Sequence, residues 1–167
     1  NLVAEMERRN KLLADRGVTK IHQYNRGVAP EERLPVIFLF HDELADWMLL
    51  PEYRDAVSTN VVRLGVKARA AGIHLVLVTQ RPDRDALPMQ LRANCSNRLV
   101  LKVADKRNSE LVLDEAGAER LLGSGHLAAK LSGEGKITLA QVPFIHEDEA
   151  IDVGNMIADA WQPEMEP

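Results

Sequence analysis

The chain has 167 residues, of which 46% are hydrophobic and 28% are charged, and its formal net charge is −4. This length and composition fit one folded domain, and they exclude a disordered or a collagen-like chain. No apolar run approaches the roughly 18 residues that a membrane helix needs, so we expect a soluble, cytoplasmic chain. The single cysteine, Cys95, excludes an internal disulfide and a cysteine-based zinc cluster. Because Asn1 opens directly into a helical pattern, we expect a piece of a longer protein.

Charge is distributed unevenly along the chain. Residues 63–109 carry ten basic and three acidic side chains, a local charge of +7, whereas residues 110–167 carry three basic and twelve acidic ones, a local charge of −9. Two interpretations stay open. The chain has solvated faces of opposite sign, or it has a local surface for a polyanion on a domain that is acidic as a whole.

The first elements follow from the spacing of apolar residues. Leu2, Met6 and Leu13 mark a helix that ends at Gly17, and the stretch 18–35, which contains two prolines, predicts a loop.

Three stretches rich in apolar residues then predict strands. Residues 36–40 and 73–79 have the pattern of strands covered on both faces, and 99–103 is interpreted as a third. Between the first two, a short helical stretch precedes a helix over 51–71 whose apolar residues fall on one stripe. Strands separated by helices imply right-handed crossovers, so we predict an α/β fold with a mostly parallel sheet flanked by helices.

The last third of the chain predicts smaller elements. They are a short helix capped by Asn108 or Ser109 that runs to Ala116, a helical turn over 117–122, a terminal β-hairpin of 127–130 and 136–142, a last helix over 150–161, and a tail, 162–167, that should fray.

Two adjacent acids, Asp42 and Glu43, follow the first predicted strand directly. In open α/β sheets, ligands bind at the carboxyl ends of the strands. For nucleotide hydrolysis, the first carboxylate can hold Mg²⁺ through its water shell and the second can polarise the attacking water. The alternative is that both are ordinary acids at a helix N-terminus, where the helix dipole favours carboxylates.

The neighbouring strand ends in Thr79 and Gln80, followed by Pro82. A glutamine here can hydrogen-bond a γ-phosphate oxygen and the attacking water, although a capped turn before the proline is the alternative. With the acid pair, Gln80 makes a nucleotide site the favoured interpretation. His41, which breaks the apolar run before the acids, is interpreted as a hydrogen-bonded histidine at a strand end, because no other histidine has metal-ligand spacing to it.

A phosphate-binding loop is missing from these residues. The motif G-x-x-x-x-G-K-[ST] does not occur, and the nearest candidate, Gly135-Lys136, lies in the predicted hairpin. The chain therefore contains half of a nucleotide site.

Several motifs together resemble the motor core of the FtsK/SpoIIIE DNA translocases. They are Asp42-Glu43-Leu44-Ala45-Asp46, KARAAGIHL at 67–75 and Thr79-Gln80-Arg81-Pro82, with further matches at 5–9, 24–25, 93–94, Arg98 and 117–123. The resemblance covers nearly the whole chain in the family's order and spacing.

The resemblance implies a RecA-like P-loop NTPase core, with residues 1–161 as its C-terminal portion and the Walker A loop upstream of Asn1. Such proteins assemble as hexameric rings and pump double-stranded DNA. The implied ligands are therefore ATP, Mg²⁺ and duplex DNA, and the implied partner is a homo-hexamer. Membrane contact would come only through segments outside this chain.

Site residues carry over by position. The resemblance makes Asp42 the Walker B partner of Mg²⁺ and Glu43 the catalytic carboxylate. It makes Gln80 the sensor and assigns Thr79 beside it to nucleotide binding.

Four basic residues also receive roles from the resemblance. Arg98 is the candidate for an arginine finger that reaches a neighbour's ATP, with a strand-edge salt bridge as the alternative. The candidates for DNA contact are Lys102, Lys106 and Arg107.

The chain also departs from the family pattern. His41 stands where the family has an apolar residue, Glu110 where it usually has an arginine near the DNA, and His126 where it has an aspartate. These differences favour a divergent member. The first prediction is an ATP-driven motor subunit that moves double-stranded DNA in chromosome segregation or conjugative and mobile-element transfer. The alternatives are a type VII secretion-like protein-translocating ATPase and a non-catalytic ring module.

Overall fold

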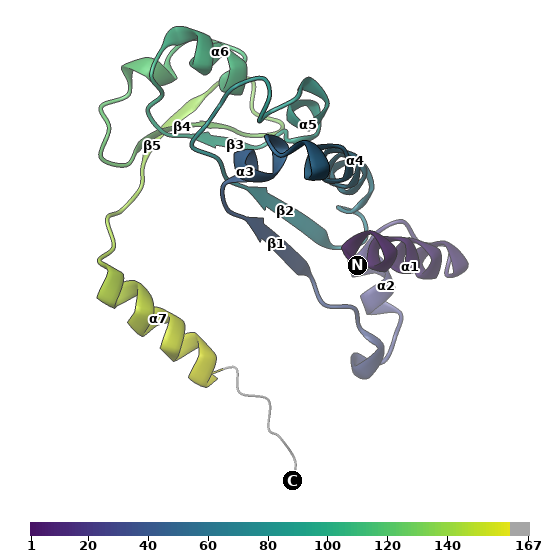
Figure 1. Ribbon diagram of the computed structural model, residues 1–167. Helices are drawn as coiled ribbons and strands as arrows, with labels where there is room; N and C mark the ends of the chain where they lie inside the picture. Colours follow the sequence, from purple (N-terminus) through teal and green to yellow (C-terminus); the bar gives the residue numbers. More distant parts are fainter. Residues whose placement is uncertain (161–167) are drawn as a thin grey trace.

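The computed structural model describes residues 1–160, and Figure 1 shows how their helices and strands are arranged. Two strands, β1 (Ile37–His41) and β2 (Ile73–Leu77), lie side by side and parallel. Their register places His41 opposite Leu77, so the two strands end level with each other. The first two predicted strands and their parallel pairing are confirmed.

One face of this pair carries the main core. The chain returns from β1 to β2 through α3 (Leu44–Met48) and α4 (Pro51–Lys67), while α1 (Leu2–Asp15) packs beside α4. α4 confirms the long helix predicted from its apolar stripe, and it ends four residues earlier than expected. The buried side chains shared by α1, α4 and the start of β2 are Val3, Met6, Leu64, Ala68, Ala71 and Ile73.

The other face of the pair is open within the described residues. Phe38 and Phe40 point to this side and are 58% and 70% exposed. The prediction that residues 36–40 and 73–79 are covered on both faces is therefore wrong for both strands within residues 1–160, because His74 and Val76 of β2 are exposed as well. Side chains of a strand alternate between the two faces, and the helices α1 and α4 cover only one of them.

The stretch 18–35 is more ordered than predicted. It contains the helix α2 (Ile21–Arg26) and a 3-10 turn, Pro30–Glu32. The side chain of Gln23 accepts hydrogen bonds from the backbone N–H groups of Thr19 and Lys20, at 3.1 Å each, and so closes the start of α2. This local cap holds a helix of six residues, too short to give an apolar period in the sequence.

The third predicted strand lies in a second sheet. β3 (Arg98–Val100) pairs antiparallel with β4 (His126–Lys130), which pairs antiparallel with β5 (Thr138–Gln141). The hairpin is confirmed, but the placing of the third strand in the parallel sheet is wrong. In β3 an exposed residue alternates with half-buried ones, which is the pattern of an antiparallel strand with one covered face.

Two short helices connect to this second sheet. α5 (Met89–Asn94) precedes β3, and α6 (Lys106–Leu113) follows it. α6 begins earlier than predicted because the side chain of Asp105 accepts from Asn108 N–H at 2.8 Å and caps the helix. It also ends three residues before the predicted end. The predicted helical turn is present as Ala118–Arg120, and it packs with α6 and β4 around Leu113, Ala118, Leu121 and Ala128.

The last helix, α7 (Glu147–Ala160), stands apart from the other elements in Figure 1. Its residues are all exposed, including Ile151 and Ile157. The predicted end of this helix at Trp161 and the tail 162–167 lie outside the described residues. Among the residues that the structure describes, no helix combines the length and the apolar character needed to cross a membrane.

Candidate functional site

The ends of β1 and β2 bring the predicted site residues together. His41 O accepts from Val78 N–H at 2.9 Å, and Leu44 N–H donates to Val78 O at 2.8 Å. Asp42 and Glu43 therefore form a two-residue loop, and the residues on either side of it are both hydrogen-bonded to the backbone of Val78. Glu43 takes the left-handed conformation, with φ 50° and ψ 68°, and caps α3. A non-glycine residue in this region is uncommon and marks a conformation that its surroundings impose.

The carboxylate of Glu43 is bound by the end of β2. Thr79 Oγ1 donates to Oε1 at 2.6 Å, and the backbone N–H of Gln80 donates to Oε2 at 3.0 Å. These two bonds lower the pKa of Glu43, because both stabilise its charged form, and Ala45 N–H and the nearby Arg81 act in the same direction. The predicted juxtaposition of Glu43 and Gln80 is confirmed, and Glu43 is ionised at neutral pH.

Asp42 is exposed beside this carboxylate. Its Oδ1 accepts from Glu43 N–H at 3.1 Å, which leaves the other oxygen to face solvent. Within residues 1–160, no group of three or more histidine, cysteine or acidic side chains is placed to hold a metal ion. The one carboxylate still fits Mg²⁺ bound beside a triphosphate, because Mg²⁺ keeps several waters and takes one or two carboxylates plus phosphate oxygens.

His41 packs against the first helix after the acids. Its ring meets the Trp47 ring edge-on at 4.4 Å, and its Nδ1 lies 3.1 Å from Asp42 O. A carbonyl can only accept, so this contact needs the proton on Nδ1. Nε2 is buried and has no hydrogen-bond partner among the described residues. The predicted hydrogen-bonded histidine is confirmed, while the contact with Trp47 was not predicted.

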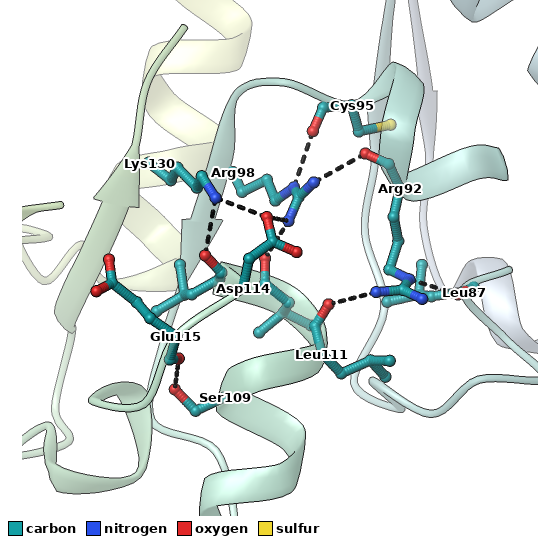
Figure 2. A network of polar contacts seen from close by, with 11 residues as sticks. Leu87, Arg92, Cys95, Arg98, Ser109, Leu111, Asp114, Glu115 and Lys130 are labelled. Atoms are coloured by element: carbon teal, nitrogen blue, oxygen red, sulfur yellow. Dashed lines mark hydrogen bonds and ion pairs between the residues drawn. The ribbon is translucent and has the colours of Figure 1, made fainter. Parts of the chain in front are cut away.

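Arg98 lies away from the acids, on β3, and its side chain is only 16% exposed. Figure 2 shows its guanidinium between three segments: it donates to the carbonyls of Arg92, Cys95 and Val112 and to Asp114 Oδ2, each at 2.9 Å.

Lys130 joins the same network. Its Nζ donates to Asp114 Oδ2 at 2.6 Å, and the pKa of Asp114 is lowered by Lys130 and by Arg98. Of the two roles weighed for Arg98, these contacts match the strand-edge ion pair, since all three nitrogens of the guanidinium donate within the chain.

The three predicted DNA-contact residues lie together near the start of α6. Lys102 is in the segment after β3, and Lys106 and Arg107 open the helix; all three are exposed. Lys106 Nζ lies 3.5 Å from Glu110 Oε1. Arg107 lines a groove of about 840 Å³ between α6, α5 and the loop after β2, whose other lining residues are Asp83, Arg84, Asp85, Met89, Arg92, Asp105, Asn108, Glu110 and Leu111. The lining of this groove thus contains both basic and acidic side chains.

The sequence analysis missed how Glu43 is held. Thr79 was assigned to the nucleotide, but its hydroxyl contacts Glu43. The available signal was the pairing of the strands: Thr79 follows β2 by two residues, as Glu43 follows β1. The left-handed backbone of Glu43 had no sequence signal, because positive φ is signalled by glycine or asparagine.

Comparisons with known proteins identify the relatives of this chain. The model of the FtsK/SpoIIIE family matches residues 1–84. The DNA translocase FtsK of Streptococcus pyogenes serotype M3 is 39% identical over 168 residues, covering 95% of this chain and 20% of FtsK. The chain thus spans about a fifth of this relative.

Two solved structures are also similar. The conjugation coupling protein TcpA of pCW3, in its monomer form with ATPγS, is 28% identical with a TM-score of 0.84, over 95% of this chain and 46% of that one. The cytoplasmic domain of the type VII secretion ATPase EccC from Thermomonospora curvata is 25% identical with a TM-score of 0.70, over 89% of this chain and 18% of that one. The predicted fold, part of a RecA-like P-loop ATPase core, is confirmed. Because the family model matches residues 1–84, just over half of the chain, the protein belongs to the FtsK/SpoIIIE family.

Proposed function

We propose that this chain is part of an ATP-driven motor that moves double-stranded DNA in chromosome segregation or in conjugative and mobile-element transfer. The observation that carries the proposal is the Glu43 carboxylate held beside Gln80 at the ends of two parallel strands. The likeness to FtsK and to the coupling protein TcpA supports DNA as the substrate. In this proposal residues 1–161 are the C-terminal portion of a motor domain, and a preceding segment supplies the phosphate-binding loop that these residues lack.

Each residue of the site has a distinct task in the proposed reaction. Glu43, as the general base, accepts a proton from the water that attacks the γ-phosphate. Gln80 is exposed, and its side chain is free to contact that phosphate and the water. Asp42 would hold Mg²⁺, which when bound neutralises charge that develops on the phosphate oxygens.

The remaining roles concern assembly and DNA. We place the DNA phosphates on Lys102, Lys106 and Arg107, whose contacts would be independent of sequence and so suit a translocase. The proposed assembly is a homo-hexamer. Arg98 would act within its own subunit, because all its contacts are internal; an arginine finger at this position would have to leave four hydrogen bonds.

The alternative functions receive less support. EccC, a type VII secretion ATPase, has the lower identity and TM-score of the two structures. A non-catalytic ring module would not need Asp42 or Glu43, and both are present.

The test is ATP hydrolysis by the intact protein, measured alone, with duplex DNA and with an unfolded polypeptide. Duplex DNA is expected to stimulate turnover. Glu43→Gln is expected to lower turnover at least about 100-fold while ATP binding is retained, because the amide cannot take the proton. Asp46→Asn, the same change at an exposed acid of α3, is the matched control and should keep the activity.

Three results would contradict the proposal. Full activity in Glu43→Gln would remove Glu43 from the reaction. Stimulation by polypeptide but not by DNA would favour a secretion ATPase. An intact protein that binds no ATP would favour the ring module.

A further inference from the structure

The helix that Glu43 begins does little to fix its carboxylate. α3 has five residues, and its contact with the carboxylate is a long bond from Ala45 N–H to Oε1 at 3.4 Å. With φ at 50°, the backbone of Glu43 is also in a conformation that its own side chain does not favour. The orientation of the carboxylate must therefore come from elsewhere.

The end of β2 supplies that orientation. Thr79 Oγ1 and Gln80 N–H bind different oxygens of Glu43, at 2.6 and 3.0 Å, so the plane of the carboxylate is set by two donors. A carboxylate has about four acceptor positions, two on each oxygen. Oε1 accepts from Thr79 and Ala45, whereas Oε2 accepts from Gln80 N–H and keeps one position for a water molecule. Because the backbone N–H of Gln80 is bound to Glu43, the side chain of Gln80 begins at a fixed position relative to the carboxylate.

The hydroxyl of Thr79 is itself directed. Its oxygen accepts from Arg81 N–H at 3.1 Å, which leaves its hydrogen for Glu43. The other acceptor in reach, Arg81 O, lies at 3.5 Å, so the 2.6 Å bond to Glu43 is strongly preferred. The turn after β2 thus orients the donor, and the donor orients the acid.

We propose that Thr79 is a positioning residue for the general base: its hydroxyl, together with Gln80 N–H, aims the Glu43 carboxylate at the attacking water. This inference rests on the proposed ATPase function, and it replaces the nucleotide-binding role that the family resemblance suggested for Thr79. Thr79 does not touch the reacting atoms itself. It acts through Glu43, so its loss should lower kcat and leave KM for ATP unchanged.

The experiment compares variants of the intact protein by steady-state ATP hydrolysis. Thr79→Val keeps the shape but removes the donor, and kcat is expected to fall roughly 10- to 100-fold with KM within about 2-fold of the wild type. Thr79→Ala serves as a second donor-less variant if valine does not fold, as judged by circular dichroism. Thr79→Ser keeps the hydroxyl and should restore most of the turnover.

A matched control is available on the hairpin. Thr138 Oγ1 donates to Glu134 Oε2 at 3.2 Å at an exposed position, so Thr138→Val removes the same kind of bond away from the site. Its turnover should equal that of the wild type.

The outcomes separate this inference from the proposed function. An active wild type with unchanged kcat in Thr79→Val and Thr79→Ala would overturn the inference alone. So would a raised KM with unchanged kcat, which would return Thr79 to nucleotide binding, or a serine variant as slow as valine. An intact wild type without ATP turnover would overturn both proposals, because no general base would then be in use.

Discussion

Arg9 joins α1 to the starts of both parallel strands. Its side chain is buried, and its Nη1 donates to Pro35 O at 2.6 Å, just before β1, and to Ala71 O at 3.1 Å, just before β2. Its Nε forms an ion pair with Glu5 Oε1 at 2.7 Å. Arg9 thus fixes the starts of the two strands relative to each other. The acids lie at the opposite ends of the same strands, which end level with each other.

Glu5 makes this arrangement sensitive to acid. Hydrogen bonds from Arg8 and then Arg9 lower its pKa from 4.5 to about 2. A carboxyl group whose pKa is lowered in the folded state contributes its full stabilisation at pH values above its unfolded pKa. This stabilisation is lost as the pH falls, here between about 4.5 and 2. Wild-type chain should lose about 1–3 kcal/mol more than Glu5→Gln over this window, in urea unfolding at several pH values. Parallel pH curves for the two chains would contradict the prediction.

At the scale of residues, the sequence predicted which site residues lie close together, but it did not predict the hydrogen bonds that hold them. Asp42, Glu43 and Gln80 were placed correctly because parallel strands bring their carboxyl ends to one edge. The burial of Arg9 could not be predicted, because its two backbone acceptors lie 26 and 62 residues away in the chain. The left-handed Glu43 is likewise imposed by the bonds to Val78, which belong to another segment.

Among the elements, α5, β3 and α6 are joined by the side chain of Arg98, which lies on β3 and donates to carbonyls at the other two. Arg98→Met should lower the free energy of unfolding by about 2–4 kcal/mol, because it removes four hydrogen bonds and leaves the carbonyls of Cys95 and Val112 without this donor. Arg107→Met, at an exposed arginine of α6, should change it by less than about 0.5 kcal/mol. Thermal unfolding of both variants is the measurement. Wild-type stability in Arg98→Met would favour the arginine-finger alternative.

Long elements with a clear period were predictable, and short ones were not. The apolar stripe of α4 and the glycine-rich turn of the hairpin, residues 132–135, appear directly in the sequence. α2 depends on a cap by Gln23, and the partner of β3 depends on a hairpin that comes 26 residues later. A three-residue strand has too few side chains to specify which sheet it joins.

At the scale of the whole molecule, the chain holds Asp42, Glu43 and the proposed sensor Gln80, but it contains no phosphate-binding motif G-x-x-x-x-G-K-[ST]. The isolated chain is therefore expected neither to hydrolyse ATP nor to bind it tightly. Thermal unfolding with millimolar Mg-ATP should give the melting temperature of the chain alone, since a ligand stabilises by the logarithm of its excess over Kd. A clear rise in melting temperature would show that residues 1–167 bind the nucleotide without further help.

The double attachment at Val78 has a consequence for how this region tolerates change. The carbonyl of His41, before the acids, and the N–H of Leu44, after them, are both hydrogen-bonded to Val78. Only the two acids lie between these bonds. Side chains between β1 and α3 can be substituted, but an insertion or deletion would break one of the two hydrogen bonds to Val78 and turn Glu43 away from Thr79. In natural variants of this chain, length should be invariant between β1 and α3 even where identity is not.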